Sequence, residues 1–286
     1  METRLLAPFG AEIVGLDLTQ PDAELAQCCF DLFDRHALCV FRETGLDDAH
    51  HVAFSRLFGE LEHAPLLRTT GPRFSQPELF DAGNLNLDGS IRNDERNRLF
   101  SAGNRQWHTD SSFRPERSSY SMLLAHIIPP AGGDTQFADM RAAYAALPEE
   151  TKARIDALEA EHSIWHSRKL AGYPEPSERE TTTIPGARQP LVLVHPRTGT
   201  KSLYLARHIS HLVGISRDEG DALLEELIAF ATQPRFVYNH VWREGDLVVW
   251  DNRCTMHRAT PFDDLAYPRD MRRTTVRDKP LASAAG

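Results

Sequence analysis

Residues 235–257, RFVYNHVWREGDLVVWDNRCTMH, hold two short apolar runs on either side of a polar turn. The runs at 235–242 and 246–251 are rich in Val, Phe, Tyr and Trp, which β-strands favour. The turn between them contains Gly245 and Asp246, a pairing typical of chain reversal. The stretch therefore predicts two short strands, and His257 falls on the next strand or at its entry.

Strand-like runs recur on both sides of this stretch. They lie at 37–42, 119–128, 134–139, 160–167, 190–196, 201–206 and 271–278, with a short strand pair at 6–18 broken by Gly10 and Gly15. Helical periodicity is found at 21–36, 47–59, 139–147, 149–159 and 216–232. Many short strands separated by turns predict a sandwich, barrel or jelly roll, with helices flanking it. We expect residues 1–286 to form one mainly β domain.

Residues 62–106 differ from the rest of the chain. They are rich in Pro, Gly, Asn, Arg and Asp and carry only short apolar runs. A stretch of this length without periodicity inside a compact enzyme is usually a functional lid or is disordered. Because aromatic and apolar residues still punctuate it, we favour an active-site lid.

Composition narrows the class of protein. The net charge of −9 speaks against a nucleic-acid partner, and an anionic substrate would need local positive charge against this field. The cysteines Cys28, Cys29, Cys39 and Cys254 have no CxxC spacing, so reduced thiols are expected. Neither a signal peptide nor a membrane-spanning run is recognisable, and we expect a cytoplasmic protein without a membrane partner. The exposed helices permit a homo-oligomer.

His108-Thr109-Asp110 is the strongest local motif. On an extended strand, residues i and i+2 point to the same face, so His108 and Asp110 can offer a nitrogen and an oxygen to one ion. A third ligand from far along the chain would complete the two-His, one-carboxylate triad of non-haem Fe(II) oxygenases. Taken alone the motif is weak, because His-x-acid pairs arise by chance in a chain with 13 His and 41 acidic residues.

Two arginines near the C-terminus suggest an anion site. Arg269 and Arg273 are four residues apart with Met271 between them, so on a strand both would face the same way. Inward guanidinium groups need anions, because an unpaired buried charge is costly, and they match carboxylates bidentately. A solvated basic edge strand is the alternative interpretation.

Together, His108, Asp110, Thr135, His257, Arg269 and Arg273 resemble the taurine dioxygenase family of Fe(II)- and 2-oxoglutarate-dependent enzymes. The resemblance runs from FGAEIVGLDL at residue 9 through NRQWHTDSSF and GDLVVWDNRCTMHR to RDMRRTT. It implies a double-stranded β-helix (jelly-roll) core, with His108, Asp110 and His257 as Fe(II) ligands. Thr135 and Arg269 would bind the distal carboxylate of 2-oxoglutarate, and Arg273 would meet the acidic head of the substrate.

The resemblance also places Asn104 near substrate or co-substrate and Trp250 beside the metal ligands. It is greatest to members that act on aryloxyalkanoates such as 2,4-dichlorophenoxyacetate. It therefore implies O2-dependent hydroxylation of the carbon next to the ether oxygen of a small anionic substrate. A taurine or alkylsulfonate dioxygenase is the alternative within the family. A zinc hydrolase and a non-catalytic binding module are the alternatives outside it.

Overall fold

The structure is a computed structural model that describes residues 1–63 and 73–279. Its strands are β1 (Glu2–Leu5), β2 (Ala11–Val14), β3 (Leu38–Phe41), β4 (Phe80–Asp81), β5 (Ser118–Ile127), β6 (Thr135–Asp139), β7 (Glu159–His162), β8 (Ala187–Pro190), β9 (Val192–Val194), β10 (Lys201–Leu203), β11 (Ile209–Leu212), β12 (Val237–His240), β13 (Leu247–Asp251), β14 (Thr255–Ala259) and β15 (Asp270–Arg277). Its helices are α1 (Ala23–His36), α2 (Asp48–Arg56), α3 (Glu95–Asn104), α4 (Met140–Ala145), α5 (Glu149–Ile155), α6 (Ile164–Leu170), α7 (Glu178–Thr183) and α8 (Arg217–Ala231), with a 3-10 turn at Pro234–Phe236.

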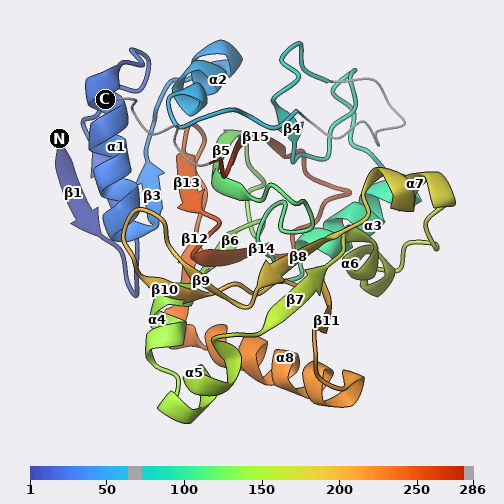
Figure 1. The fold of residues 1–286 in the computed structure, drawn as a ribbon. Helices are drawn as coiled ribbons and strands as arrows, with labels where there is room; N and C mark the ends of the chain where they lie inside the picture. The colour runs from blue at the N-terminus through green and yellow to red at the C-terminus, as the bar shows by residue number, and fades with distance from the viewer. Residues whose placement is uncertain (64–72, 280–286) are drawn as a thin grey trace.

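Two sheets face each other at the centre of the molecule (Figure 1). The large sheet has the order β1-β2-β3-β13-β5-β15-β4, and its strands are antiparallel except for the parallel pair β2 and β3. The small sheet, β12-β6-β14, is antiparallel. Phe137 of the small sheet packs with Val40, Leu123 and Val248 of the large one. This is the mainly β, jelly-roll architecture with flanking helices that the sequence predicts.

Strand β3 and the first four residues of β13 are apolar at every position because both of their faces are buried. In β3, Leu38 and Val40 face the small sheet, whereas Cys39 and Phe41 belong to a second core on the opposite face. In β13, Val248 likewise faces the small sheet and Val249 belongs to the second core. The second core is closed by α1 and α2.

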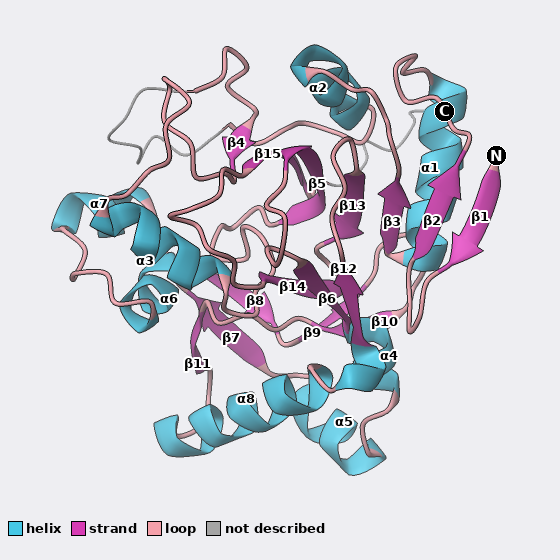
Figure 2. Ribbon diagram, turned by 180° about the vertical axis from the view of Figure 1, so that it is seen from behind, coloured by secondary structure: helices cyan, strands magenta, loops and turns pink. Residues whose placement is uncertain are grey.

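The remaining helices lie on two other sides of the core. Helices α4, α5 and α8 pack beside the small sheet, and α3, α6 and α7 gather at one side of the molecule (Figure 2). Within residues 1–63 and 73–279, no helix combines the length and the apolar character needed to cross a membrane.

Several predicted elements differ from the structure. The strand predicted at 160–167 ends at His162, and α6 begins at Ile164 because the Ser163 side chain accepts a hydrogen bond from the His166 amide. The strand pair predicted at 6–18 begins earlier, since β1 lies at 2–5 and Gly10 (φ 95°) occupies the turn. The sequence analysis also did not predict β11, α3, α6 and α7.

The predicted lid, 62–106, is described only outside residues 64–72. Its described part contains β4 and α3, so it is less irregular than its composition suggests. Strand β4 pairs with β15, placing Phe80 opposite Arg273 and Asp81 opposite Arg272. The segment thus lies against the strand that carries a predicted substrate residue, and its action as a lid stays a prediction.

Candidate active site

Three predicted metal ligands, His108, Asp110 and His257, converge at one point. One ligand atom from each of them lies within 4.8 Å of the others, and the two imidazole centroids are 4.2 Å apart. His257 belongs to β14, and His108 forms an isolated bridge to it through two backbone hydrogen bonds of 3.0 and 2.8 Å. Residues 149 positions apart in sequence are therefore held side by side by the backbone.

The local geometry of the motif differs from the prediction of an extended strand. Only His108 is bridged; Asp110 lies in a turn, and the next residue, Ser111, has a φ of +55°. The chain turns here because Asp110 N donates to the Asn252 side chain and Ser118 Oγ donates to the carbonyl of Asp110. The two ligands share one site because of this turn, not because of strand alternation.

The carboxylate of Asp110 is buried and fully engaged. Ser121 Oγ donates to its Oδ2 at 2.7 Å, and Arg273 Nη1 donates to its Oδ1 at 2.6 Å. Burial alone would raise the pKa of Asp110, but the Arg273 guanidinium beside it holds this pKa well below its usual range. Asp110 is therefore ionised, as a metal ligand must be.

The two imidazoles are held in the neutral state. His108 Nδ1 lies 2.7 Å from the Gln106 carbonyl, which leaves Nε2 directed to the site. Burial lowers the pKa of both His108 and His257. Two neutral imidazoles and one ionised carboxylate are the donor set of a facial-triad metal site.

Asn252 organises the surroundings of Asp110. Its Oδ1 accepts from the Asp110 amide at 3.1 Å and from Trp250 Nε1 at 3.0 Å. Its Nδ2 donates at 2.9 Å to Ser121 Oγ, the hydroxyl that binds the Asp110 carboxylate. The Trp250 ring lies 4.7 Å from the His257 ring, in the predicted place beside the metal ligands. One buried amide thus fixes both the backbone and the carboxylate of a ligand.

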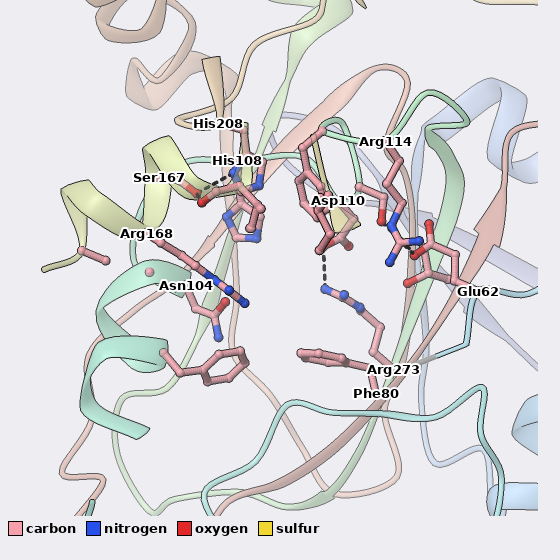
Figure 3. Close-up of a pocket in the computed structure, with 18 of the residues that line it drawn as sticks. Glu62, Phe80, Asn104, His108, Asp110, Arg114, Ser167, Arg168, His208 and Arg273 are labelled. Atoms are coloured by element: carbon pink, nitrogen blue, oxygen red, sulfur yellow. Dashed lines mark hydrogen bonds and ion pairs between the residues drawn. The ribbon is translucent and has the colours of Figure 1, made fainter. Parts of the chain in front are cut away.

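A pocket opens directly onto the ligands (Figure 3). Arg273 lines it, as predicted for a substrate residue, and its guanidinium lies over the Phe80 ring at 4.7 Å. Apolar and aromatic side chains form much of the rest of the lining: Phe80, Leu99, Phe100, Phe113, Ile164, Tyr173 and Ile184. Such a wall suits an aromatic or aliphatic group next to an anionic head.

A smaller, adjoining pocket contains Arg269. Arg269 donates to the Ala82 carbonyl at 3.0 Å and to the Gly133 carbonyl at 3.4 Å, while its buried Nε has no hydrogen-bond partner in the part of the chain that the structure describes. Among the described residues, no carboxylate forms an ion pair with it, and burial lowers its pKa to about 10. Asn104 lines both pockets. A buried guanidinium with spare donors is poised for an anion.

The sequence predicts that Arg269 and Arg273 face the same way on one strand, and the structure differs from this prediction. Arg269 precedes β15, and an irregularity between Asp270 and Met271 breaks the strand alternation. The two arginines therefore serve adjacent pockets. Thr135 is buried at the start of β6, where Trp242 Nε1 donates to its hydroxyl oxygen at 3.0 Å. Its own hydroxyl proton remains available for an acceptor.

Several residues at the site were not singled out from the sequence. Ser121 and Asn252 meet across 131 positions, so no local pattern links them. His208 is buried in the pocket wall with Nδ1 2.8 Å from Ser167 Oγ. Arg168 lines the pocket from α6, a helix whose first four residues fell within the strand predicted at 160–167. For Asn252, an Asn directly after an apolar strand was the available signal.

The chain is similar in sequence to proteins of known activity. A family model described as "Taurine catabolism dioxygenase TauD, TfdA family" matches residues 2–275. The chain is 44% identical over 245 residues to the "Alpha-ketoglutarate-dependent 2,4-dichlorophenoxyacetate dioxygenase" of Burkholderia sp. (strain RASC), covering 85% of this chain and 82% of that protein. It is 36% identical to the "(S)-phenoxypropionate/alpha-ketoglutarate-dioxygenase" of Sphingobium herbicidovorans, covering 98% and 95% of the two chains.

A solved structure is similar over the whole length. It is described as "AAD-2 in complex with Mn(II) and N-oxalylglycine", and it shares 41% identity with this chain. The TM-score is 0.90, over 99% of this chain and 100% of the other. The similar protein binds a divalent metal together with a small dicarboxylic acid.

Proposed function

The chain belongs to the TauD, TfdA family of dioxygenases, and we propose that it is an Fe(II)- and 2-oxoglutarate-dependent aryloxyalkanoate dioxygenase. It would hydroxylate the carbon next to the ether oxygen of a compound such as 2,4-dichlorophenoxyacetate. The products would be a phenol, glyoxylate, succinate and CO2. The observation that carries the proposal is the convergence of His108, Asp110 and His257, the first two of which line a pocket that also holds an arginine and many apolar side chains.

The metal is assigned to these three side chains. Two imidazoles and a carboxylate leave positions open for other ligands, and this set is typical of Fe(II) oxygenases. Bound Fe(II), with 2-oxoglutarate and O2, supplies the oxidation that places one oxygen atom on the substrate carbon and the other in succinate. The Asp110 carboxylate would bind the metal in its ionised form, since the Arg273 guanidinium keeps the pKa of Asp110 low.

Arg269 and Thr135 are assigned to the distal carboxylate of 2-oxoglutarate. Arg269 is a buried cation with an unpartnered Nε–H, and the energetic cost of its burial falls when an anion arrives. Thr135 Oγ1 already accepts from Trp242, so its hydroxyl proton is free to be donated to a carboxylate oxygen. Arg269 also donates to the Gly133 carbonyl, two residues before Thr135.

Arg273 and Asn104 are assigned to the substrate. Arg273 donates Nη1 to Asp110, and its buried Nε–H has no hydrogen-bond partner among the described residues, so it can bind the substrate carboxylate beside the metal. Asn104, at the end of α3, lines both pockets and lies between substrate and co-substrate. The aryl group would then pack against Phe80, Phe100 and Phe113, whose rings match it in shape and polarity.

A substrate panel tests this proposal. Protein loaded with Fe(II) and 2-oxoglutarate would be offered 2,4-dichlorophenoxyacetate, 2-phenoxypropionate or taurine in air, and phenol or sulfite release would be followed. We expect phenol from the aryloxy acids and little sulfite from taurine, because the pocket wall is aromatic and apolar. Sulfite release that exceeds phenol release would indicate that the substrate is an alkylsulfonate. Phenol release without oxygen would indicate a hydrolase instead.

A further inference from the structure

Thr135, which we assign to the co-substrate, lies on the middle strand of the small sheet, β12-β6-β14 (Figure 1). In the register of this sheet it is opposite His240 of β12 and Ala259 of β14. Residues directly opposite each other share a face, so these three form one row across the sheet. Two residues along, about 6.6 Å away, Phe137 and the metal ligand His257 form the next row on the same face. Thr135 therefore lies one row from a metal ligand.

Trp242 decides how the Thr135 hydroxyl is used. It follows β12, is buried, and donates from Nε1 to Thr135 Oγ1 at 3.0 Å. An indole nitrogen is a donor only, so the Thr135 oxygen has to accept and its own proton has to point elsewhere. In the part of the chain that the structure describes, this hydroxyl donates to no acceptor. The sequence analysis assigned no role to Trp242.

Buried neighbours hold the Trp242 ring in place. The ring packs in the core between the two sheets, and the His240 imidazole lies nearly perpendicular to it with the ring centroids 4.5 Å apart. His240 is itself fully buried, and its Nε2 lies 3.2 Å from Oδ2 of Asp246, a carboxylate that also pairs with Arg42. The indole N–H is therefore directed at Thr135 before a ligand arrives.

We propose that Trp242 is a positioning residue for the co-substrate: it turns the Thr135 hydroxyl proton toward the distal carboxylate of 2-oxoglutarate. Without the indole N–H the hydroxyl is free to rotate, and the hydrogen bond to the carboxylate weakens. Arg269 would neutralise the same carboxylate, so Trp242 acts on the direction of the contact and not on its charge. The inference rests on the proposed function, and it limits the effect of Trp242 to 2-oxo acids that carry a second carboxylate.

A double-mutant cycle of Trp242→Phe and Thr135→Val tests the inference. Trp242→Phe removes the indole N–H and keeps an aromatic ring in the core. Mn(II)-loaded protein would be titrated calorimetrically with 2-oxoglutarate under anaerobic conditions. We expect Trp242→Phe to raise the Kd about 3- to 10-fold, the loss of one well-directed hydrogen bond. In Thr135→Val protein, which has no hydroxyl to turn, the same replacement should raise the Kd no further.

Tyr144→Phe is the matched control. Tyr144 is a buried aromatic residue of α4, the helix that directly follows β6, and its hydroxyl donates to Asp156 at 2.7 Å. It lines neither pocket, so its replacement removes an aromatic donor and should leave the Kd of 2-oxoglutarate as in wild type. A second ligand, 2-oxopentanoate, has the same chain length without the distal carboxylate. It should bind wild type and Trp242→Phe equally.

Three results would overturn the inference: an unchanged Kd for 2-oxoglutarate in Trp242→Phe, additive losses in the double variant, or equal losses for the two 2-oxo acids. A loss in Tyr144→Phe as large as that in Trp242→Phe would also overturn it. Wild-type protein that binds 2-oxoglutarate without oxidising an aryloxyalkanoate would contradict the proposed function, and the cycle would still decide the role of Trp242. Wild-type protein that does not bind 2-oxoglutarate would overturn both.

Discussion

Ser121 shows how single side chains decide the metal site. It connects Asn252 to the Asp110 carboxylate through two hydrogen bonds, of 2.9 and 2.7 Å. Groups that orient metal ligands through such bonds affect metal affinity although they do not touch the metal. The site is thus larger than the three residues that the sequence motif reveals.

Ser121→Ala should weaken Mn(II) binding about 10- to 100-fold, because Asp110 loses the donor that fixes its Oδ2. Ser119→Ala is the matched control: it lies on the same strand and is buried, but its hydroxyl donates to the Val276 carbonyl at 3.3 Å. Equilibrium titration of the apoprotein with Mn(II) measures both. Equal affinities for the two variants would show that Asp110 needs no such support.

Arg269→Gln should raise the KM for 2-oxoglutarate about 10- to 100-fold while the metal still binds, because one charge-assisted pair is lost. Arg272→Gln is the comparison, since Arg272 is three residues away and pairs with Asp270 and Asp48 at 2.8 and 2.6 Å. Steady-state kinetics with varied 2-oxoglutarate give the result. If only Arg272→Gln raises this KM, the co-substrate assignment belongs to that residue.

At the scale of elements, the sequence predicted strands better than it predicted the walls of the pocket. The runs around Val40 and Val249 are apolar at every position, and burial on both faces makes such strands recognisable. The first half of α6 was predicted as part of a strand at 160–167, because the helix is short and mixed in character and only the Ser163 cap marks its start. Arg168 was missed with it. The metal motif was found, although a turn rather than a strand forms it.

The segment after residue 72 is anchored at its base by a buried carboxylate. Asp81 has no exposed side-chain surface, and it pairs with Arg73 at 3.3 Å and with Arg92. Arg73 also pairs at 2.6 Å with Asp270, the first residue of the strand that carries Arg273. These ion pairs fasten the predicted lid to β15.

Asp81→Asn should loosen this segment, because two arginines lose their shared anion; breaking a buried pair costs about 3–5 kcal/mol. Asp88→Asn is the control, since Asp88 is exposed in the same segment and bonds only to Ser90 in the described structure. Hydrogen exchange of residues 73–106 should speed up in Asp81→Asn alone, with a higher substrate KM. Unchanged exchange would mean that other contacts hold the segment.

At the scale of the whole molecule, buried neutral histidines set the response to acid. Burial lowers the pKa of both His51 and His162 to about 3. The unfolded chain binds protons at these residues below about pH 6.5, whereas the folded chain does not. Above about pH 6.5 these histidines therefore do not destabilise the fold, and the free energy of unfolding decreases as the pH falls from about 6.5 toward 3.

We expect the free energy of unfolding to fall with a slope of about 1.4 kcal/mol per pH unit for each such histidine. His162→Gln should make the slope shallower by that amount, since an amide can still bond to Ser112. His211→Gln, at the surface, should leave the slope unchanged. Urea titrations between pH 4 and 7 measure this. A slope in His162→Gln identical to wild type would place the acid sensitivity elsewhere.

The overall fold was accessible from sequence because it depends on patterns repeated along the chain. The site could be predicted only in part, since the sequence shows which residue types can bind a metal but not which side chains they contact. Asp110 and Arg273, for example, meet across 163 positions at 2.6 Å. The resemblance to a family indicated which distant residues share one site, and periodicity alone cannot indicate this.

The central claim is that His108, Asp110 and His257 form an Fe(II) centre that couples 2-oxoglutarate to aryloxyalkanoate oxidation. It is tested most directly by measuring succinate and phenol together, after anaerobic loading with Fe(II) and 2-oxoglutarate and addition of 2,4-dichlorophenoxyacetate and O2. The account predicts equal amounts of the two products, and neither of them from Asp110→Ala. Phenol formed without succinate, or wild-type turnover by Asp110→Ala, would contradict it.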